Sequence, residues 1–419
     1  MPGYKLTDAG VIPEDWGEAP LKGKINIAHG FAFASEHFAS HGPYRLTTPG
    51  HFYEAGGFRV IADKQKYYVG PVPSDYVLEP GDLIIAMTEQ AEGLLGSAAV
   101  VPPEHRYLHN QRLGRVKVLS PDSEPDYLAY VFNSQRYRAK VRETAAGTKV
   151  KHTSPEKLLA IRVPLPPPTE QRAIAAALSD VDALLAGLDR LIAKKRDLKQ
   201  AAMQQLLTGQ TRLPGFQGEW EVRRLGDLGA TYGGLTGKSK ADFGSGTAKY
   251  VTFMNVMTNT VIDDSTFDSV RVSPAENQNR VELGDLLFNG SSETPEEVAL
   301  CSLVARDVPN LYLNSFCFGF RLREDAQTNA LFLTYYIRSA GGREIMKSLA
   351  QGSTRYNLSK KALLAAAVRL PAVAEQDAIA TVLSDMDAEL TALEARRDKT
   401  RALKQGMMQE LLTGRTRLV

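Results

Sequence analysis

A long internal repeat is the feature of this sequence that most constrains its fold. The segment 165–213 returns 205 positions later as the segment 370–418, and 28 of its 49 residues are identical in the two copies. This period is about half of the 419-residue chain, far longer than the repeats of solenoid proteins. The chain therefore divides into two tandem halves, each a globular domain followed by the repeated segment, and we expect a pseudo-two-fold molecule.

Each repeated segment predicts one long helix. In the first copy we expect the helix to begin after Pro166-Pro167-Pro168, with Thr169 as N-cap, and to end at Thr208 before Gly209. The second copy predicts a helix from about Glu375 to Thr413. Apolar residues three or four positions apart form a stripe along each helix. The stripe comprises Leu178, Val181, Leu185, Leu188, Ile192, Leu198, Ala202 and Leu206 in the first helix, and Leu383, Met386, Leu390, Leu393, Leu403, Met407 and Leu411 in the second.

The two helices are expected to pack against each other as an antiparallel coiled coil. A helix of about 40 residues with an apolar stripe does not stay folded in water without a partner. Both helices place acidic residues early and basic residues late, for example Asp182 before Lys199 and Asp387 before Lys404. Antiparallel packing sets the acidic end of one helix beside the basic end of the other. The alternative is two independent helices, each packed on its own domain.

The two globular domains share landmarks although their sequences diverge. Trp16 corresponds to Trp220, and segment 81–85 (GDLII) corresponds to 284–288 (GDLLF). Segment 108–114 (LHNQRLG) likewise corresponds to 313–319 (LNSFCFG). Each Gly-Asp pair indicates a turn before a buried strand. Short helices are expected over 126–143 and 330–350. We predict mixed α/β, strand-rich domains at 1–164 and 214–369, with a central helical spacer at 165–213 and a distal one at 370–419.

Composition argues against several classes of protein. The formal net charge is only +2, which is weak evidence for a polyanionic partner. Cys301 and Cys317 are the two cysteines, too few for a disulfide framework or a zinc module, so we expect core residues. No export or membrane segment is evident, which favours the cytoplasm. The histidines show no metal-binding spacing, and we expect no metal site.

The sequence offers no convincing catalytic motif. Tyr232–Ser239 (YGGLTGKS) approaches a phosphate-binding loop of the form GxxxxGK[ST], but its first glycine is replaced by Tyr232. We interpret this segment as a flexible basic surface loop that includes Lys238. A methyl-transfer enzyme would need a glycine-rich cofactor loop that the sequence lacks. Catalysis is therefore expected in another chain.

Candidate DNA contacts lie in two junction loops, 147–152 and 352–357, just upstream of the long helices. Glycine, basic, hydroxyl and aromatic groups in these loops suit phosphate oxygens and base edges. Further candidates follow each Gly-Asp strand. The alternative is that these are ordinary polar loops and turn caps. The candidate DNA-binding residues are Lys149, Lys151, His152, Thr88 and Gln90 in the first half, and Arg355, Tyr356, Asn357, Asn289, Ser291 and Lys238 in the second.

Taken together, the repeated motifs resemble those of the specificity (S) subunits of type I restriction-modification systems. The Leu-Pro…Glu-Gln…Ala-Ile-Ala elements at 165–175 and 370–380 resemble the family's entry into its long helices. The Leu-Leu-Thr-Gly stretches at 206–209 and 411–414 resemble its exit. The resemblance implies two target recognition domains, each reading one half of an asymmetric bipartite DNA site. It also implies two methyltransferase subunits that carry S-adenosylmethionine, with motor-nuclease subunits as optional further partners, and no cofactor in this chain.

Other functions remain open at this point. A stand-alone DNA-binding regulator with two reading domains is the main alternative. A coiled-coil scaffold that joins proteins without DNA is a weaker one, and a nuclease or nucleotide hydrolase is weaker still. The joint duplication of the Glu-Gln and Leu-Leu-Thr-Gly elements favours the specificity subunit.

Overall fold

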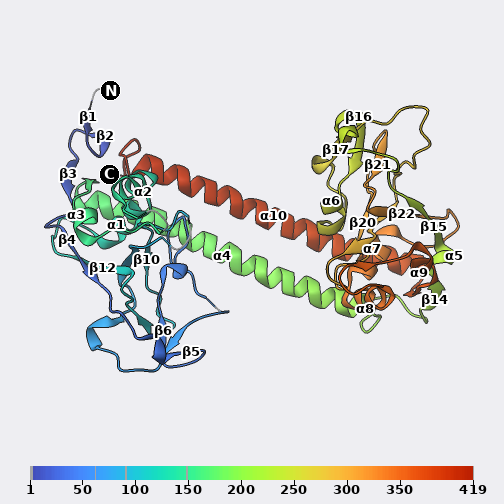
Figure 1. Cartoon of the computed structure of the whole chain (residues 1–419), viewed down its shortest axis with the longest axis horizontal. Coiled ribbons are helices and arrows are strands. Elements are labelled where there is room, and N and C mark those ends of the chain that lie inside the picture. Colours follow the sequence, from blue (N-terminus) through green and yellow to red (C-terminus); the bar gives the residue numbers. More distant parts are fainter. Residues whose placement is uncertain (1–2, 62, 90–91, 148–149, 419) are drawn as a thin grey trace. The chain divides into compact units, whose positions relative to one another are not determined.

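The computed structural model describes residues 3–61, 63–89, 92–147 and 150–418. The chain forms two compact units by packing: unit 1 comprises 1–189 and 396–419, and unit 2 comprises 190–395. Each of the long helices, α4 (Pro168–Leu206) and α10 (Val373–Leu411), contributes one half to each unit (Figure 1). The domain limits predicted above follow the repeat and not this packing, so they stay a prediction.

Unit 1 is built around a four-stranded antiparallel sheet in the order β10-β9-β12-β4. The central strand β9 is buried at all four positions, as expected of the apolar run after Gly81-Asp82. It pairs with β12 from Leu113↔Ala86 to Val116↔Leu83. The strands are β4 (Ile25–His29), β9 (Leu83–Ala86), β10 (Ala98–Val100) and β12 (Leu113–Val118).

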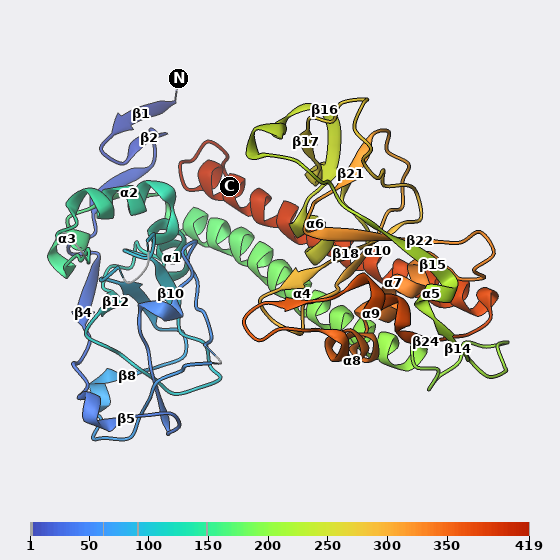
Figure 2. The same cartoon turned by 45° about the vertical axis from the view of Figure 1, so that its right-hand side comes forward.

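Short strands form the rest of the β structure in unit 1. A five-stranded lobe has the order β5-β7-β6-β11-β8, with β6 and β11 parallel. Figure 2 shows β5 and β8 at the opposite end of the unit from α2. Two further strand pairs, β1-β2 and β3-β13, complete the β structure of unit 1. The bounds are β1 (Tyr4–Thr7), β2 (Gly10–Pro13), β3 (Gly17–Pro20), β5 (Phe38–Ala39), β6 (Tyr44–Leu46), β7 (Tyr67–Tyr68), β8 (Val77–Leu78), β11 (Tyr107–Leu108) and β13 (Arg162–Leu165).

The helical segment of each domain consists of two helices. Short helices were expected over 126–143, and the chain forms α1 (Pro125–Asn133) and α2 (Gln135–Thr144), joined at Ser134. The Ser134 side chain accepts a hydrogen bond from the Tyr137 N–H, so it acts as the N-cap of α2. A serine inside a helical pattern therefore marks a break. A short helix, α3 (Pro155–Leu159), precedes β13.

Unit 2 repeats the central sheet and the helix pair of unit 1, whereas its remaining strands form a three-stranded sheet, β17-β16-β21, and the pairs β14-β24 and β19-β23. Its central sheet has the order β15-β22-β18-β20, the counterpart of β4-β12-β9-β10. Ser339 separates α7 from α8 and caps α8, as Ser134 does for α2, and the helical structure expected over 330–350 is confirmed as two helices. The bounds are β14 (Glu221–Arg224), α5 (Leu225–Leu228), β15 (Gly229–Gly233), β16 (Phe243–Val251), α6 (Phe253–Thr258), β17 (Asp268–Val270), β18 (Leu286–Asn289), β19 (Ser291–Ser292), β20 (Cys301–Leu303), β21 (Leu311–Leu313), β22 (Cys317–Leu322), α7 (Ala330–Arg338), α8 (Ala340–Leu349), β23 (Tyr356–Asn357), α9 (Lys360–Ala365) and β24 (Ala367–Leu370). Both cysteines are buried, as predicted.

The helix stripes are confirmed in most positions. Leu178 and Leu383 are fully buried, and Leu188 and Leu390 are also buried. Four further stripe residues are half-buried: Val181, Leu185, Met386 and Leu393. The long helices begin slightly earlier than expected, α4 at Pro168 and not after Thr169, because proline fits the first helical turn. They also end at Leu206 and Leu411, two residues before the predicted ends.

Two leucines assigned to the stripe face solvent. Leu198 is 47% exposed and Leu403 is 59% exposed. Lysines take the seam positions beside them: the Lys199 side chain is 18% exposed and that of Lys404 is 21% exposed. Long lysine stems cover the apolar surface while their ammonium groups reach carboxylates. The helical period alone did not distinguish these lysines from their leucine neighbours.

Within each unit the two helix halves run antiparallel, as predicted. In unit 1 the Lys404 ammonium lies 2.6 Å from the Asp182 carboxylate, and the Tyr130 hydroxyl donates to the same carboxylate at 2.9 Å. Unit 2 repeats the arrangement, because Lys199 pairs with Asp387 and Tyr335 donates to it at 2.7 Å. Both pairs join an early residue of one helix to a late residue of the other. The alternative of two independent helices is excluded.

The repeated entry and exit motifs form a lock in each unit. Glu170 at the start of α4 accepts hydrogen bonds from Arg417 Nε (2.6 Å) and Nη2 (2.8 Å). Trp16 Nε1 donates to the same carboxylate at 3.0 Å. In unit 2 Glu375 at the start of α10 receives Arg212 in the same way. The exit of one helix is therefore fastened to the entry of the other, and this contact explains why both motifs are duplicated together.

Candidate nucleic-acid interface

Three segments of unit 1 that are distant in sequence meet at one end of the central sheet. The Met87 N–H donates to the Arg112 carbonyl at 3.0 Å, and the Met87 carbonyl accepts from the Thr153 N–H at 2.9 Å. Thr88 and His152 form an antiparallel bridge beside them. The backbone thus joins the end of β9, the turn before β12 and the junction loop. Two of the predicted candidates, Thr88 and His152, are brought together.

Unit 2 forms the same frame. The Gly290 N–H donates to the Phe316 carbonyl at 3.0 Å, and the Gly290 carbonyl accepts from the Leu358 N–H at 3.0 Å. Strands β19 and β23 place Ser291 opposite Asn357. Gly290 therefore takes the place of Met87. The frame, defined here as the end of the Gly-Asp strand, the turn and the junction loop, is common to both units.

The side chains that the two frames expose are different. In unit 1 Arg112, Lys151 and His152 are exposed and Thr88 is half-buried. In unit 2 Phe316 is 60% exposed and the Arg355 guanidinium lies 5.9 Å from the centre of its ring. These groups suit phosphate, base-edge and base-methyl contacts.

The polar groups of the unit 2 frame bind one another. Arg355 Nη2 donates to the buried Ser291 hydroxyl at 3.2 Å, and Asn357 Nδ2 donates to the Arg355 carbonyl at 3.3 Å. Asn357 is exposed, whereas Tyr356 is half-buried and packs against the core. Of these predicted contacts, Arg355 and Asn357 present polar groups at the surface.

The turn tips were missed by sequence reasoning. Asn110 accepts the Arg112 N–H on its side chain at 3.1 Å, and Asn314 accepts the Phe316 N–H at 2.9 Å. The two asparagines thus form the same turn, and Arg112 and Phe316 occupy the same position in it. The signal was an asparagine three residues before an apolar strand. The sequence comparison aligned Leu108 with Leu313, and this alignment shifts Asn110 and Asn314 out of correspondence by one residue.

Other predicted contacts are placed less favourably. Asn289 is fully buried, and its amide donates to the carbonyl groups of Ser291 (3.2 Å) and Glu297 (2.9 Å). A DNA base does not reach it in this conformation. Lys149 and Gln90 lie outside the described residues, so their predicted role stays a prediction.

The segment around Lys238 is held by side-chain contacts. Lys238 Nζ lies 2.5 Å from Glu276 Oε2, with only 6% of the lysine side chain exposed, and it donates to the Arg271 carbonyl at 2.6 Å. The ammonium lowers the pKa of Glu276 to about 2. Tyr232 donates to the buried Asp285 carboxylate at 2.6 Å. The expectation of a flexible loop with a free lysine is therefore wrong for Lys238.

An arginine anchors the loop beside each frame. Arg138 is 5% exposed and donates to the carbonyl groups of Leu95 (2.9 Å) and Glu54 (3.2 Å) as well as Gly93. Burial lowers the pKa of Arg138 to about 10. Arg343 is its counterpart and donates to the carbonyl groups of Glu296, Val298 and Ala299. The loops are held by their backbones, which leaves their side chains free to differ.

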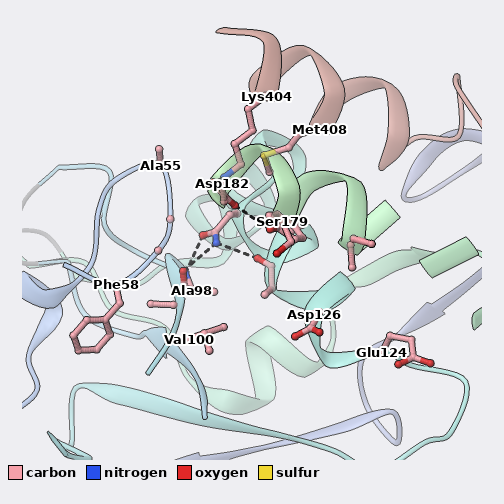
Figure 3. Close-up of a pocket in the computed structure, with 18 of the residues that line it drawn as sticks. Ala55, Phe58, Ala98, Val100, Glu124, Asp126, Ser179, Asp182, Lys404 and Met408 are labelled. Carbon is pink, nitrogen blue, oxygen red and sulfur yellow. Dashed lines mark hydrogen bonds and ion pairs between the residues drawn. The ribbon is translucent and has the colours of Figure 1, made fainter. Parts of the chain in front are cut away.

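A hollow of about 650 Å³ in unit 1 is a less suitable DNA site. Figure 3 shows Lys404 and Met408 above Asp182 and Ser179, with Ala98 and Val100 on the opposite side. Its lysine is paired with Asp182, and its Arg172 is paired with Glu124. No cluster of His, Cys, Asp or Glu suited to a metal ion is found among the described residues.

Comparison with known proteins identifies the class. The family model "Type I restriction modification DNA specificity domain" matches the chain twice, at residues 13–194 and 217–401. The type I restriction enzyme EcoKI specificity subunit of Escherichia coli K12 is 22% identical, over 96% of this chain and 89% of that protein. The MjaVIII specificity subunit of Methanocaldococcus jannaschii is 25% identical over 50% of this chain and 49% of its own length. In that match the chain spans about half of the relative.

A solved structure has the same fold. The S subunit of a type I restriction-modification system from M. genitalium matches with a TM-score of 0.58 and 16% identity, over 98% of both chains. The two matches of the family model define a protein with two tandem specificity domains. The family model covers most of the chain, and the chain therefore belongs to the type I restriction modification DNA specificity family. No helix in the described part of the chain is long and apolar enough to cross a membrane.

Proposed function

We propose that this chain is the DNA sequence-specificity subunit of a type I restriction-modification complex. Each globular domain reads one half of an asymmetric bipartite site. The observation that carries this proposal is the frame that both units share, which exposes Arg112, Lys151 and His152 in one unit and Phe316, Arg355 and Asn357 in the other. Related frames suit related positions on two half-sites, and unlike side chains suit unlike bases.

We further propose that the chain is not catalytic and acts in the cytoplasm. Two methyltransferase subunits bind S-adenosylmethionine and methylate adenine, and motor-nuclease subunits are optional further partners. The names of the relatives support assembly, since EcoKI is a restriction enzyme with a separate specificity subunit. The alternative, a stand-alone regulator, requires tight site-specific binding by this chain alone.

The first test is a genome-wide map of methylated adenines in cells with and without this chain. The proposal expects a bipartite motif that disappears when the chain is removed. Purified complex is expected to methylate oligonucleotides that carry the motif, whereas the methyltransferase subunits alone are not. Tight, site-specific binding by the isolated chain, together with an unchanged methylation map, would favour the regulator.

The second test addresses spacing. We propose that α4 and α10, each 39 residues long, set the distance between the half-sites. Insertion of four residues after both Leu188 and Leu393 adds about 6 Å of helix. Four residues are close to one turn, so the stripe stays near its register. The unspecified spacer is expected to lengthen by about one to two base pairs, since each pair adds about 3.4 Å. A complex that still assembles and methylates the original spacing would contradict this role of the helices.

A further inference from the structure

One structural position carries a different exposed side chain in each unit. Arg112 and Phe316 each stand one residue before the strand that pairs with the end of the Gly-Asp strand. Leu113 is opposite Ala86 in unit 1, and Cys317 is opposite Asn289 in unit 2. Both tips have their backbone N–H bound by an asparagine side chain. The backbone at this position is therefore fixed in the same way in both units.

The surroundings of Arg112 leave its guanidinium available. Its side chain is exposed, and its backbone is held on both sides, by Asn110 and by the Met87 N–H. Among the described residues no hydrogen bond or ion pair engages the guanidinium. The fork of an arginine matches guanine O6 and N7 in the major groove, the commonest specific contact between a side chain and a base.

The surroundings of Phe316 are those of an apolar tip beside a cation. The ring is 60% exposed, which leaves apolar surface in water. The Arg355 guanidinium lies 5.9 Å from the ring centre and is tethered to Ser291 Oγ. An apolar side chain in the major groove favours the thymine methyl group, and a neighbouring cation suits the phosphate of the same strand.

We propose that this shared tip sets one base position in each half-site, a guanine through Arg112 and a thymine through Phe316. The inference rests on the proposed function and deepens it, because it names the base that each tip selects. It also accounts for an exposed phenyl ring and for a guanidinium that no described residue engages, at equivalent places in a duplicated frame.

The test uses the complete complex and duplex oligonucleotides that carry the mapped motif. Each specified position is replaced in turn by the other three base pairs, and methylation rates are compared for wild type, Arg112→Ala and Phe316→Ala. Arg112→Ala is expected to reduce the preference for guanine about tenfold or more at a single position of one half-site. Phe316→Ala is expected to reduce the preference for thymine at a single position of the other, by a smaller factor.

Matched controls lie at the far ends of the strands concerned. Lys117→Ala removes an exposed charge near the end of β12 away from Arg112. Leu283→Ala removes a side chain that is 60% exposed before β18, away from Phe316. Both controls are expected to keep every base preference. Because all four side chains are exposed, the variants are expected to fold.

Two kinds of result overturn the assignment. One is an unchanged preference at every position, or an affected position whose wild-type base is not guanine for Arg112 or thymine for Phe316. The other is an equal loss at all positions, which indicates a phosphate contact. Failure of the proposed function is seen separately, in a wild-type complex whose methylation does not depend on this chain.

Discussion

Arg417→Ala is expected to destabilise unit 1 strongly. The Glu170 side chain is fully buried, and the Arg417 side chain is 28% exposed. Arg417 supplies two of the three hydrogen bonds that the carboxylate receives, the third coming from Trp16. Loss of the arginine leaves a buried carboxylate without its countercharge, which typically costs about 3–5 kcal/mol. Because Trp16 remains and solvent reaches the vacated position, we expect the lower end, about 3 kcal/mol.

The measurement uses the two tryptophans of the chain, Trp16 and Trp220. In a Trp220→Phe background the fluorescence of Trp16 reports the unfolding of unit 1. For a unit of this size, about 3 kcal/mol corresponds to a fall in Tm of about 6–12 °C. The matched control is Arg415→Ala, because Arg415 is 68% exposed and only 3.5 Å from Glu410. That exposed pair is expected to contribute at most about 1 kcal/mol.

A second substitution separates the buried charge from general damage. Glu170→Gln in the Arg417→Ala background removes the unpaired charge and keeps an acceptor for Trp16. The double variant is expected to be more stable than Arg417→Ala alone. If Arg417→Ala costs no more than Arg415→Ala, or if Glu170→Gln restores nothing, the argument from a buried unpaired carboxylate is refuted.

Two further predictions concern pH and the anchored loops. All seven histidines lie between His29 and His152, and burial lowers the pKa of His109 to about 4. The pKa of an unfolded histidine is about 6.5, so the stability that neutral His109 contributes is complete above that pH and is lost as pH falls towards 4. The free energy of unfolding of unit 1 should therefore fall by about 1–2 kcal/mol between pH 7.5 and 5.5. Unfolding followed through Trp16 measures this loss, and His109→Gln, but not exposed His41→Gln, should reduce it. Part of the loss should remain, because burial also lowers the pKa of His51. Equal pH dependence in both variants contradicts the assignment. Arg343→Lys should cost about 1–3 kcal/mol and speed hydrogen exchange over 296–299, because one ammonium does not replace a fork that binds three carbonyl groups. Exposed Glu344→Gln is the control, and unchanged exchange in Arg343→Lys would show that the guanidinium does not hold the loop.

Features with a local or repeated signal were predictable from the sequence. Strands β9 and β18 follow a Gly-Asp turn with an uninterrupted apolar run, and both are buried as expected. The long helices and their antiparallel order followed from the repeat and from charge order. Ser134 and Ser339 were missed as helix breaks because serine fits both a helix surface and an N-cap.

Features set by distant partners were not predictable. Lys238 looked like a free basic group, yet its partner Glu276 lies 38 residues further along the chain. Asn289 looked like an accessible amide after the Gly-Asp strand, yet it is fully buried and donates to the carbonyl groups of Ser291 and Glu297. Arg112 and Phe316 were not recognised as equivalent from the sequence. Their equivalence depends on the register of the two sheets, and the similarity of the flanking residues did not reveal it.

The composition of unit 1 has a consequence for how the protein is made. Ile174 and Leu178 share a core with Leu411 and Leu412. The core of unit 1 is therefore incomplete until the last residues of the chain have been translated. All of unit 2, residues 190–395, leaves the ribosome in between, which at typical rates of synthesis takes about 10–40 s. During this interval the apolar surface of unit 1 that Leu411 and Leu412 later cover stays exposed in the nascent chain. We therefore expect the later half to finish folding first, and the earlier half to be the one that engages chaperones.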